Sequence, residues 1–174
     1  FKFGSKVKDN YAVIEVDEAN LKYITEYITP EVITVTNLFR DQLDRYGEVY
    51  TTLNKILEGI YNVPETTLVL NGDESLLGKL DLKNPVHFYG FDKAVNDNKT
   101  IEINADAKFC KFCKTPYEYN FVTYNHLGDF YCPNCGYKRS DLMYAVTDII
   151  DINADKSTVK FNDLEVSINQ SGTY

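Results

Sequence analysis

Blocks of apolar residues along the first 90 positions predict strands that alternate with helices. Four short apolar runs have the length and β-branched content of strands, at 11–16, 32–36, 67–70 and 86–89. The first run is almost continuously apolar, which is typical of a parallel strand buried on both faces. Apolar spacing predicts helices at about 18–28, from Asn37 to about Arg45, after Gly47 to Ile60, and at about 74–80. This alternation predicts a parallel α/β sheet with right-handed crossovers.

The pattern changes in the last third of the chain. Three short runs joined by Asp- and Asn-containing turns read as strands, at 143–149, 157–161 and 164–168. Such closely spaced strands favour an antiparallel extension of the sheet.

Size and charge narrow the functional classes. The chain has 174 residues, of which 44% are hydrophobic, so we expect a folded core. No apolar run approaches the roughly 20 residues of a membrane span. A formal charge of -8 argues against non-specific binding to nucleic acid or to an anionic membrane surface. The start at Phe1 lacks Met and resembles neither a signal nor a transit peptide, so we expect an intracellular piece of a longer protein.

The strongest chemical signal is the arrangement of the four cysteines. They form two Cys-x2-Cys pairs separated by 18 residues, at Cys110, Cys113, Cys132 and Cys135. Each pair can present two thiolates from a tight turn, and two pairs complete a tetrahedron around Zn²⁺ at about 2.3 Å per bond. Gly136 follows the second pair, where a positive φ is often needed.

The residues between the two pairs predict a zinc ribbon. Strands are expected at 117–119 and 129–131, with a turn at 125–128. Four sulfur ligands close the coordination shell, so we expect a structural rather than a catalytic ion. Two disulfides and an iron or iron–sulfur site are less favoured alternatives, and His126 is expected to be a solvated turn histidine.

Basic residues cluster around the cysteines. A Zn²⁺ ion with four thiolates carries a net charge of -2, which nearby cations can offset. The same cluster could also be read as a nucleic-acid patch. Its members are Lys108, Lys111, Lys114, Lys138 and Arg139.

Polar residues stand at the ends of the predicted strands, where open α/β sheets bind ligands. Glu15 lies inside the first apolar run, and a buried carboxylate there requires either a salt bridge or a bound Mg²⁺. Asn37 follows the second strand, and both Asn37 and Asp73 could be ordinary helix N-caps. Lys55 reads as a solvated helix lysine rather than a modified catalytic one.

Three segments, 13–19, 36–48 and 70–74, resemble in that order the central domain of Mur ligases. Together with the four-cysteine ribbon, they are similar to the Mur-ligase-like subunits of lipid II isoglutaminyl synthases. The resemblance covers nearly the whole chain. It implies a Mur-ligase-like α/β central domain with a mostly parallel sheet, an inserted zinc ribbon and a short antiparallel β extension.

The same resemblance implies a division of the chain into three parts. Residues 1–104 would be the α/β part of the central domain, 105–140 the ribbon insertion, and 141–174 the continuation of the central domain. The domain would be incomplete at both ends.

The resemblance also implies an activity. Such subunits use ATP and Mg²⁺ to phosphorylate the α-carboxyl of the D-glutamate in lipid II, in the cytoplasm, during peptidoglycan synthesis. A GatD-like glutaminase partner supplies the ammonia that forms the amide. By similarity, Glu15 would hold Mg²⁺, Asn37 would lie beside the γ-phosphate, and Asn71 and Asp73 would lie near the nucleotide. Gln42 stands where many Mur ligases have a histidine metal ligand.

One motif of the family is missing. No Gly-x4-Gly-Lys-Ser/Thr sequence occurs in the chain, although Mur ligases use one to hold the ATP phosphates. We therefore expect this chain to retain zinc but to lack catalysis by itself. The alternative interpretation is a non-catalytic zinc-ribbon module that docks a protein or a nucleic acid.

Overall fold

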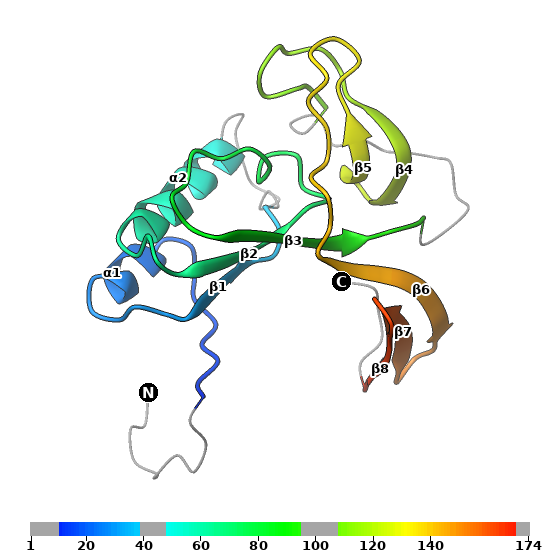
Figure 1. Cartoon of the computed structure of the whole chain (residues 1–174), viewed down its shortest axis with the longest axis horizontal. Helices are drawn as coiled ribbons and strands as arrows, with labels where there is room; N and C mark the ends of the chain where they lie inside the picture. Colours follow the sequence, from blue (N-terminus) through cyan, green and yellow to red (C-terminus); the bar gives the residue numbers. More distant parts are fainter. Residues whose placement is uncertain (1–10, 39–47, 95–107, 170–174) are drawn as a thin grey trace.

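The computed structural model describes residues 11–38, 48–94 and 108–169, and its elements are shown in Figure 1. A single six-stranded sheet has the order β1-β2-β3-β6-β7-β8, and a separate hairpin is formed by β4 and β5. In chain order the elements are α1 (Leu21–Thr25), β1 (Val32–Val35), α2 (Glu48–Tyr61), β2 (Thr67–Asn71), β3 (Val86–Phe91), β4 (Glu118–Tyr124), β5 (Leu127–Tyr131), β6 (Tyr144–Ile152), β7 (Ser157–Phe161) and β8 (Leu164–Ile168).

The sheet confirms the predicted topology. Strands β1, β2, β3 and β6 pair in parallel, and β6, β7 and β8 continue the sheet as antiparallel neighbours. The β4–β5 hairpin lies between β3 and β6 in sequence and stands beyond the carboxyl ends of β2 and β3 (Figure 1). The hairpin is therefore an insertion at the edge of the sheet where ligands bind in α/β folds.

The main core lies between the two helices and the first strands. On α2, the residues Val49, Leu53, Ile56 and Ile60 recur with helical spacing and are all buried. They pack with Ile33 and Val35 of β1, Leu68 and Leu70 of β2, and Leu21 of α1. Burial alternates along β1, so in the described residues only one face of this strand is covered.

The contact between the helices requires a glycine on α2. A Cβ added at Gly59 would lie 2.7 Å from Cγ of Leu21 and 2.9 Å from the backbone nitrogen of Lys22. An exposed ion pair, Lys22–Glu58 at 3.1 Å, borders the same contact. The close approach of the backbones fixes how α1 lies on α2.

Two predicted elements are wrong at the start of the chain. Residues 11–16 form no strand, and Tyr11, Val13 and Ile14 are exposed at 81%, 101% and 55%. No described strand pairs with this segment, so its backbone gains no ladder hydrogen bonds. Of its apolar side chains, the half-buried Val16 packs against the main core. The helix expected at about 18–28 is reduced to the five residues of α1.

The short helix expected at about 74–80 is a series of turns. Several of its carbonyl groups accept hydrogen bonds from side chains of the cysteine-containing segment 108–140, and not from the N–H groups of a helix. The Tyr137 hydroxyl donates to the carbonyl of Ser75 at 2.6 Å, and the Lys111 ammonium donates to the carbonyls of Leu76 and Gly78. Tertiary partners have replaced the i to i+4 hydrogen bonds of a helix.

Some predictions lie outside the described residues. These are the helix from Asn37 to Arg45 beyond Leu38, the residue Gln42, and the boundary between 104 and 105. Among the described residues, none of the helices has the length and apolarity needed to cross a membrane.

Candidate metal centre and strand-end site

The two cysteine pairs form equivalent backbone turns. In the first, the Cys110 amide donates to the Thr115 carbonyl at 2.8 Å, and the Lys114 amide donates to the Cys110 carbonyl at 2.9 Å. In the second, Cys132 and Tyr137 are joined at 2.7 Å, and Gly136 and Cys132 at 3.0 Å. Each turn contains one left-handed residue at the same place, with φ of 62° at Lys114 and 71° at Gly136. The positive φ predicted for Gly136 is confirmed.

These turns bring the four sulfur atoms together. All four Sγ atoms lie within 4.8 Å of one another, with 3.6 Å between Cys110 and Cys135 and 3.4 Å between Cys113 and Cys132. All four cysteines are free, so the alternative of two disulfides is not supported. A tetrahedral site with Zn–S bonds of about 2.3 Å separates its sulfurs by about 3.8 Å. The cluster therefore fits the predicted zinc ribbon and could hold one metal ion.

An aromatic cluster packs against the cysteines. Tyr117, Phe130 and Tyr137 are buried together with Cys110 and Cys132. The Tyr137 ring lies 5.4 Å from the Phe130 ring and 6.2 Å from the Tyr117 ring, both tilted. This small core gives the ribbon its own hydrophobic centre, adjacent to the metal ligands.

The electrostatics of the sulfurs are set partly by local hydrogen bonds. The Cys113 Sγ lies 3.4 Å from the Thr115 hydroxyl. Hydrogen bonds from this hydroxyl and from the Thr115 amide lower the pKa of Cys113 to about 5. A thiolate at this position is the form that binds a metal.

Two of the basic residues expected to offset the thiolates also contact the α/β part of the chain. The Lys111 ammonium donates to the backbone carbonyls of Leu76, at 3.1 Å, and of Gly78. Burial lowers the pKa of this amine to about 8, against the opposing effect of Glu74. Arg139 is paired with Asp73 and Asp129. Both side chains hold the ribbon against the sheet, and Lys111 also interacts favourably with Cys110, which raises the pKa of its amine. The expected countercharge role is therefore retained for Lys111.

His126 is buried rather than solvated, which corrects the prediction. Only 6% of this residue is exposed, and its Nε2 lies 2.8 Å from Oε2 of Glu74, whose side chain is fully buried. The other Glu74 oxygen accepts from the Leu76 amide at 3.1 Å. The turn between β4 and β5 is thus inserted into the α/β part, directly over the segment that follows β2.

A buried ion pair also joins the ribbon to the same segment. Arg139 Nη1 donates to Oδ1 of Asp73 at 2.9 Å and to the carbonyl of Phe91 at 2.7 Å, while its Nε lies 3.2 Å from Asp129. Asp73 is fully buried, and its Oδ2 accepts from the Phe91 amide at 3.2 Å. Burial raises the pKa of Asp73, and the Arg139 hydrogen bond opposes that shift. The helix N-cap interpretation of Asp73 is therefore wrong.

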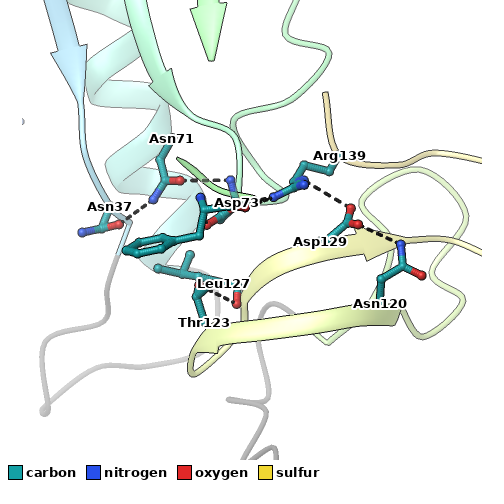
Figure 2. A network of polar contacts seen from close by, with 9 residues as sticks. Asn37, Asn71, Asp73, Asn120, Thr123, Leu127, Asp129 and Arg139 are labelled. Atoms are coloured by element: carbon teal, nitrogen blue, oxygen red, sulfur yellow. Dashed lines mark hydrogen bonds and ion pairs between the residues drawn. The ribbon is translucent and has the colours of Figure 1, made fainter. Parts of the chain in front are cut away.

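Asn71 and Asn37 continue this network to the ends of β2 and β1 (Figure 2). The Asp73 amide donates to Oδ1 of Asn71 at 2.9 Å, and Nδ2 of Asn71 donates to Oδ1 of Asn37 at 2.8 Å. A backbone N–H can only donate, so it fixes which end of the Asn71 amide faces which partner. The Nδ2 of Asn37 consequently points away from Asn71, as a donor at the carboxyl edge of the sheet.

The structure brings together three of the four predicted strand-end residues. Asn37, Asn71 and Asp73 are linked, but Glu15 is exposed and shares no hydrogen bond or ion pair with them among the described residues. The argument that a buried Glu15 needs a metal or a salt bridge no longer applies. Lys55 is exposed, as expected for a solvated helix lysine.

Sequence reasoning missed Glu74 and the role of Arg139. An available signal was the run of carboxylates at 73–74 directly after a buried strand, since buried carboxylates require cations or donors. Nothing in the local sequence shows that these partners come from a segment more than 50 positions away.

Comparison with known proteins identifies the class of this domain. Residues 2–136 match the family description of the Mur ligase middle domain. The chain therefore belongs to the Mur ligase middle-domain family. A solved pseudomurein peptide ligase type C from Methanothermus fervidus superposes with a TM-score of 0.61 and covers 87% of this chain and 29% of that one. At 22% identity this likeness shows the fold alone.

Within that family, the chain is similar to curated subunits called MurT. It is 39% identical over 171 residues to the MurT subunit of the glutamine-hydrolyzing lipid II isoglutaminyl synthase of Streptococcus pneumoniae. It is 30% identical over 168 residues to the corresponding subunit of Staphylococcus aureus strain COL. These matches cover 98% and 92% of this chain, but only 38% of each relative. The chain thus spans well under half the length of these relatives.

Proposed function

We propose that the chain is the central domain of a ligase subunit that activates the α-carboxyl of D-glutamate in lipid II for amidation. The observation that carries this proposal is the 39% identity to a MurT subunit over nearly the whole chain. In this reaction the substrate carboxylate attacks the γ-phosphorus of ATP, which releases ADP and leaves an acyl phosphate. Ammonia then displaces phosphate and forms the amide of D-isoglutamine.

The strand-end residues suit a role in holding the nucleotide. Asn37 directs an amide donor outward at the carboxyl edge of the sheet, which matches the oxygen of a phosphate group. Mg²⁺ bound with ATP would supply charge neutralisation on the phosphates. We assign Asn37 to the γ-phosphate and Asn71 and Asp73 to its support, and we retain Glu15 as a candidate Mg²⁺ ligand.

The remaining parts of the proposal follow from the same relationship. A GatD-like glutaminase would form a heterodimer with the full-length protein and supply ammonia. The reaction would take place in the cytoplasm, where ATP is available. The four cysteines would hold one structural Zn²⁺, and the domain division at residues 104 and 140 belongs to the same proposal. By itself this chain would not turn over ATP.

A direct test is glutamine-dependent amidation by the full-length protein with its glutaminase, using lipid II and ATP and detecting the product by mass spectrometry. Replacement of Asn37 with Ala should lower kcat/KM by at least about tenfold, because a preorganised donor to the phosphate is lost. Asn153→Ala is a matched control, because Asn153 lies in the exposed turn between β6 and β7. Amidation that needs no ATP, or equal losses in both variants, would contradict the proposal.

The alternative of a docking module is less well supported by the geometry. It depended on the basic residues around the cysteines, and two of them are occupied within the chain by the Asp73 carboxylate and by backbone carbonyls. Lys108, Lys114 and Lys138 remain exposed. A full-length protein that binds a partner through these lysines but does not amidate lipid II would favour the alternative.

A further inference from the structure

The ribbon and the strand-end amides are joined by one continuous set of directional contacts. It runs from Arg139 to the Asp73 carboxylate, from the Asp73 amide to Asn71, and from Asn71 to Asn37 (Figure 2). Each contact is between 2.8 and 2.9 Å. No single residue of this set is unusual, but together they connect the end of the ribbon with the ends of β1 and β2.

Arg139 is itself held on the ribbon. Its backbone amide donates to the Phe130 carbonyl at 3.0 Å, and Phe130 belongs to the aromatic cluster beneath the sulfurs. Its guanidinium lies 5.3 Å from the centre of the Phe121 ring, and Asp129 holds its Nε. Asp129 accepts in turn from Asn120 of β4 at 2.8 Å. The position of the guanidinium is therefore set by the fold of the ribbon.

Asp73 is held from three sides. Arg139 contacts Oδ1, the Phe91 amide contacts Oδ2, and the Gly128 amide donates to the Asp73 carbonyl at 3.1 Å. Two of these three partners, Arg139 and Gly128, belong to the ribbon region. The ribbon thus holds the side chain and the carbonyl group of the residue whose amide fixes the orientation of the Asn71 side chain.

We propose that Arg139 and Asp73 are positioning residues for the nucleotide site, which through Asn71 keep the donor end of the Asn37 amide turned outward. The inference rests on the proposed function for the identity of the ligand. An asparagine side chain presents a donor at one end and an acceptor at the other, and the two ends have nearly the same shape. If Asn71 loses its fixed orientation, Asn37 can turn its oxygen toward a phosphate, which repels it. The ribbon is then part of the nucleotide site without contacting the nucleotide.

The test measures nucleotide affinity and hydrogen exchange in the full-length protein, with the non-hydrolysable ATP analogue AMP-PNP as the probe. In Arg139→Gln we expect AMP-PNP to bind at least about fivefold more weakly, as for the loss of one positioned hydrogen bond. Exchange should become faster at the amides of Asp73 and Phe91. Arg139→Lys keeps the charge and should recover part of the affinity.

Two further variants separate positioning from general loosening. Lys93→Gln removes an exposed cation that lies 2.6 Å from Asp148, and it should leave affinity and exchange within about twofold of the wild type. Lys111→Met removes a different contact between the ribbon and the sheet, away from Asp73. It should affect AMP-PNP binding less than Arg139→Gln does. Equal losses of AMP-PNP affinity in Lys111→Met and Arg139→Gln would overturn the inference. They would show that any weakening of the contact between the ribbon and the sheet has the same effect.

Zinc content, measured by elemental analysis, shows whether each variant keeps its ribbon. If Arg139→Gln loses zinc, Asp73→Asn gives the second test, since it preserves shape, removes the ion pair and replaces one of the two accepting oxygens with an NH2 group. Faster exchange with unchanged AMP-PNP affinity in that variant would overturn the inference. Absence of lipid II amidation in the wild type, with AMP-PNP binding still sensitive to Arg139, would refute the proposed function but support the positioning role.

Discussion

The buried pair formed by Glu74 and His126 allows a quantitative test of how the ribbon is anchored. The Glu74 side chain is fully buried and the His126 side chain is 7% exposed, so water can replace neither partner. Each Glu74 oxygen has one partner, the Leu76 amide or His126 Nε2. Replacement of His126 with Phe keeps an aromatic ring of similar shape but leaves one buried carboxylate oxygen without its donor.

The expected loss can be estimated from this geometry. Leaving a buried polar group without its hydrogen-bond partner costs about 1–3 kcal/mol. His126→Phe should therefore lower the free energy of unfolding by about 1–3 kcal/mol. Glu74→Gln keeps the hydrogen bond from Leu76 and should cost about 1–2 kcal/mol. In the double variant Glu74→Leu with His126→Phe, neither polar partner remains, and the loss should be smaller than the sum of the losses in Glu74→Leu alone and His126→Phe alone.

The assay is urea unfolding of the chain at a fixed excess of zinc, followed by circular dichroism, for the wild type, Glu74→Gln, Glu74→Leu, His126→Phe and the double variant of the last two. Constant zinc is required because metal binding itself shifts apparent stability. We expect a coupling free energy of at least about 1 kcal/mol between Glu74→Leu and His126→Phe. Additive losses, or a loss below about 1 kcal/mol for His126→Phe, would refute the reasoning.

Three further predictions follow from the ribbon. Elemental analysis should find one zinc per chain, and chelation should release four reactive thiols and abolish the near-ultraviolet signal of the tyrosine cluster, because metal binding contributes roughly 10–16 kcal/mol to such modules. Gly128→Ala should destabilise the ribbon by more than about 2 kcal/mol, since a Cβ there would lie 2.3 Å from the carbonyl oxygen of Phe121 at a φ of +156°. Tyr137→Phe should cost about 1–2 kcal/mol in thermal unfolding, because the Ser75 carbonyl loses its 2.6 Å donor.

The two substitutions each have a matched control. Gly136→Ala should cost only about 1 kcal/mol, because a Cβ at Gly136 meets nothing within 4 Å and only the positive φ opposes it. Equal losses at the two glycines would show that the close contact with Phe121 is not limiting. Tyr61→Phe removes a hydroxyl from a residue that is 59% exposed and should change stability by less than about 0.5 kcal/mol. For the metal, retention of the tyrosine signal after complete chelation would contradict the expected role of zinc.

The sequence predicted the elements whose burial or chemistry is visible in the spacing of nearby residues. The helix α2 buries Val49, Leu53, Ile56 and Ile60 with the spacing that the sequence displays. The strands β2 and β3 coincide with apolar runs bounded by turn residues. The metal cluster was predictable because two residues between cysteines place both sulfurs on one turn. In these cases the information lies within a few positions of the element itself.

The predictions that failed depended on distant partners. An apolar run such as 11–16 becomes a strand only beside another strand, and no described strand pairs with it. His126 occupies a polar turn in sequence, but that turn inserts over Glu74, which lies far away along the chain. The segment after β2 forms turns where a helix was expected, and side chains from the ribbon donate hydrogen bonds to its carbonyl groups. Residues that become buried where an inserted segment packs on the rest of the chain cannot be recognised from the apolar spacing of the flanking sequence.

The place where the hairpin enters and leaves the sheet has a consequence for engineering. The excursion leaves at one end of the parallel β3–β6 ladder and returns at the other, because the Asp92 amide donates to Val146 at 3.0 Å and the Met143 amide donates to Phe88 at 2.9 Å. A deletion would therefore need a replacement crossover of about a dozen residues or more to join the two parallel strands. It would also strip the carboxylates of Asp73 and Glu74 of their cationic and imidazole partners. A version of this domain without the ribbon would therefore need neutral residues in place of Asp73 and Glu74, so that no unpaired carboxylate is left buried.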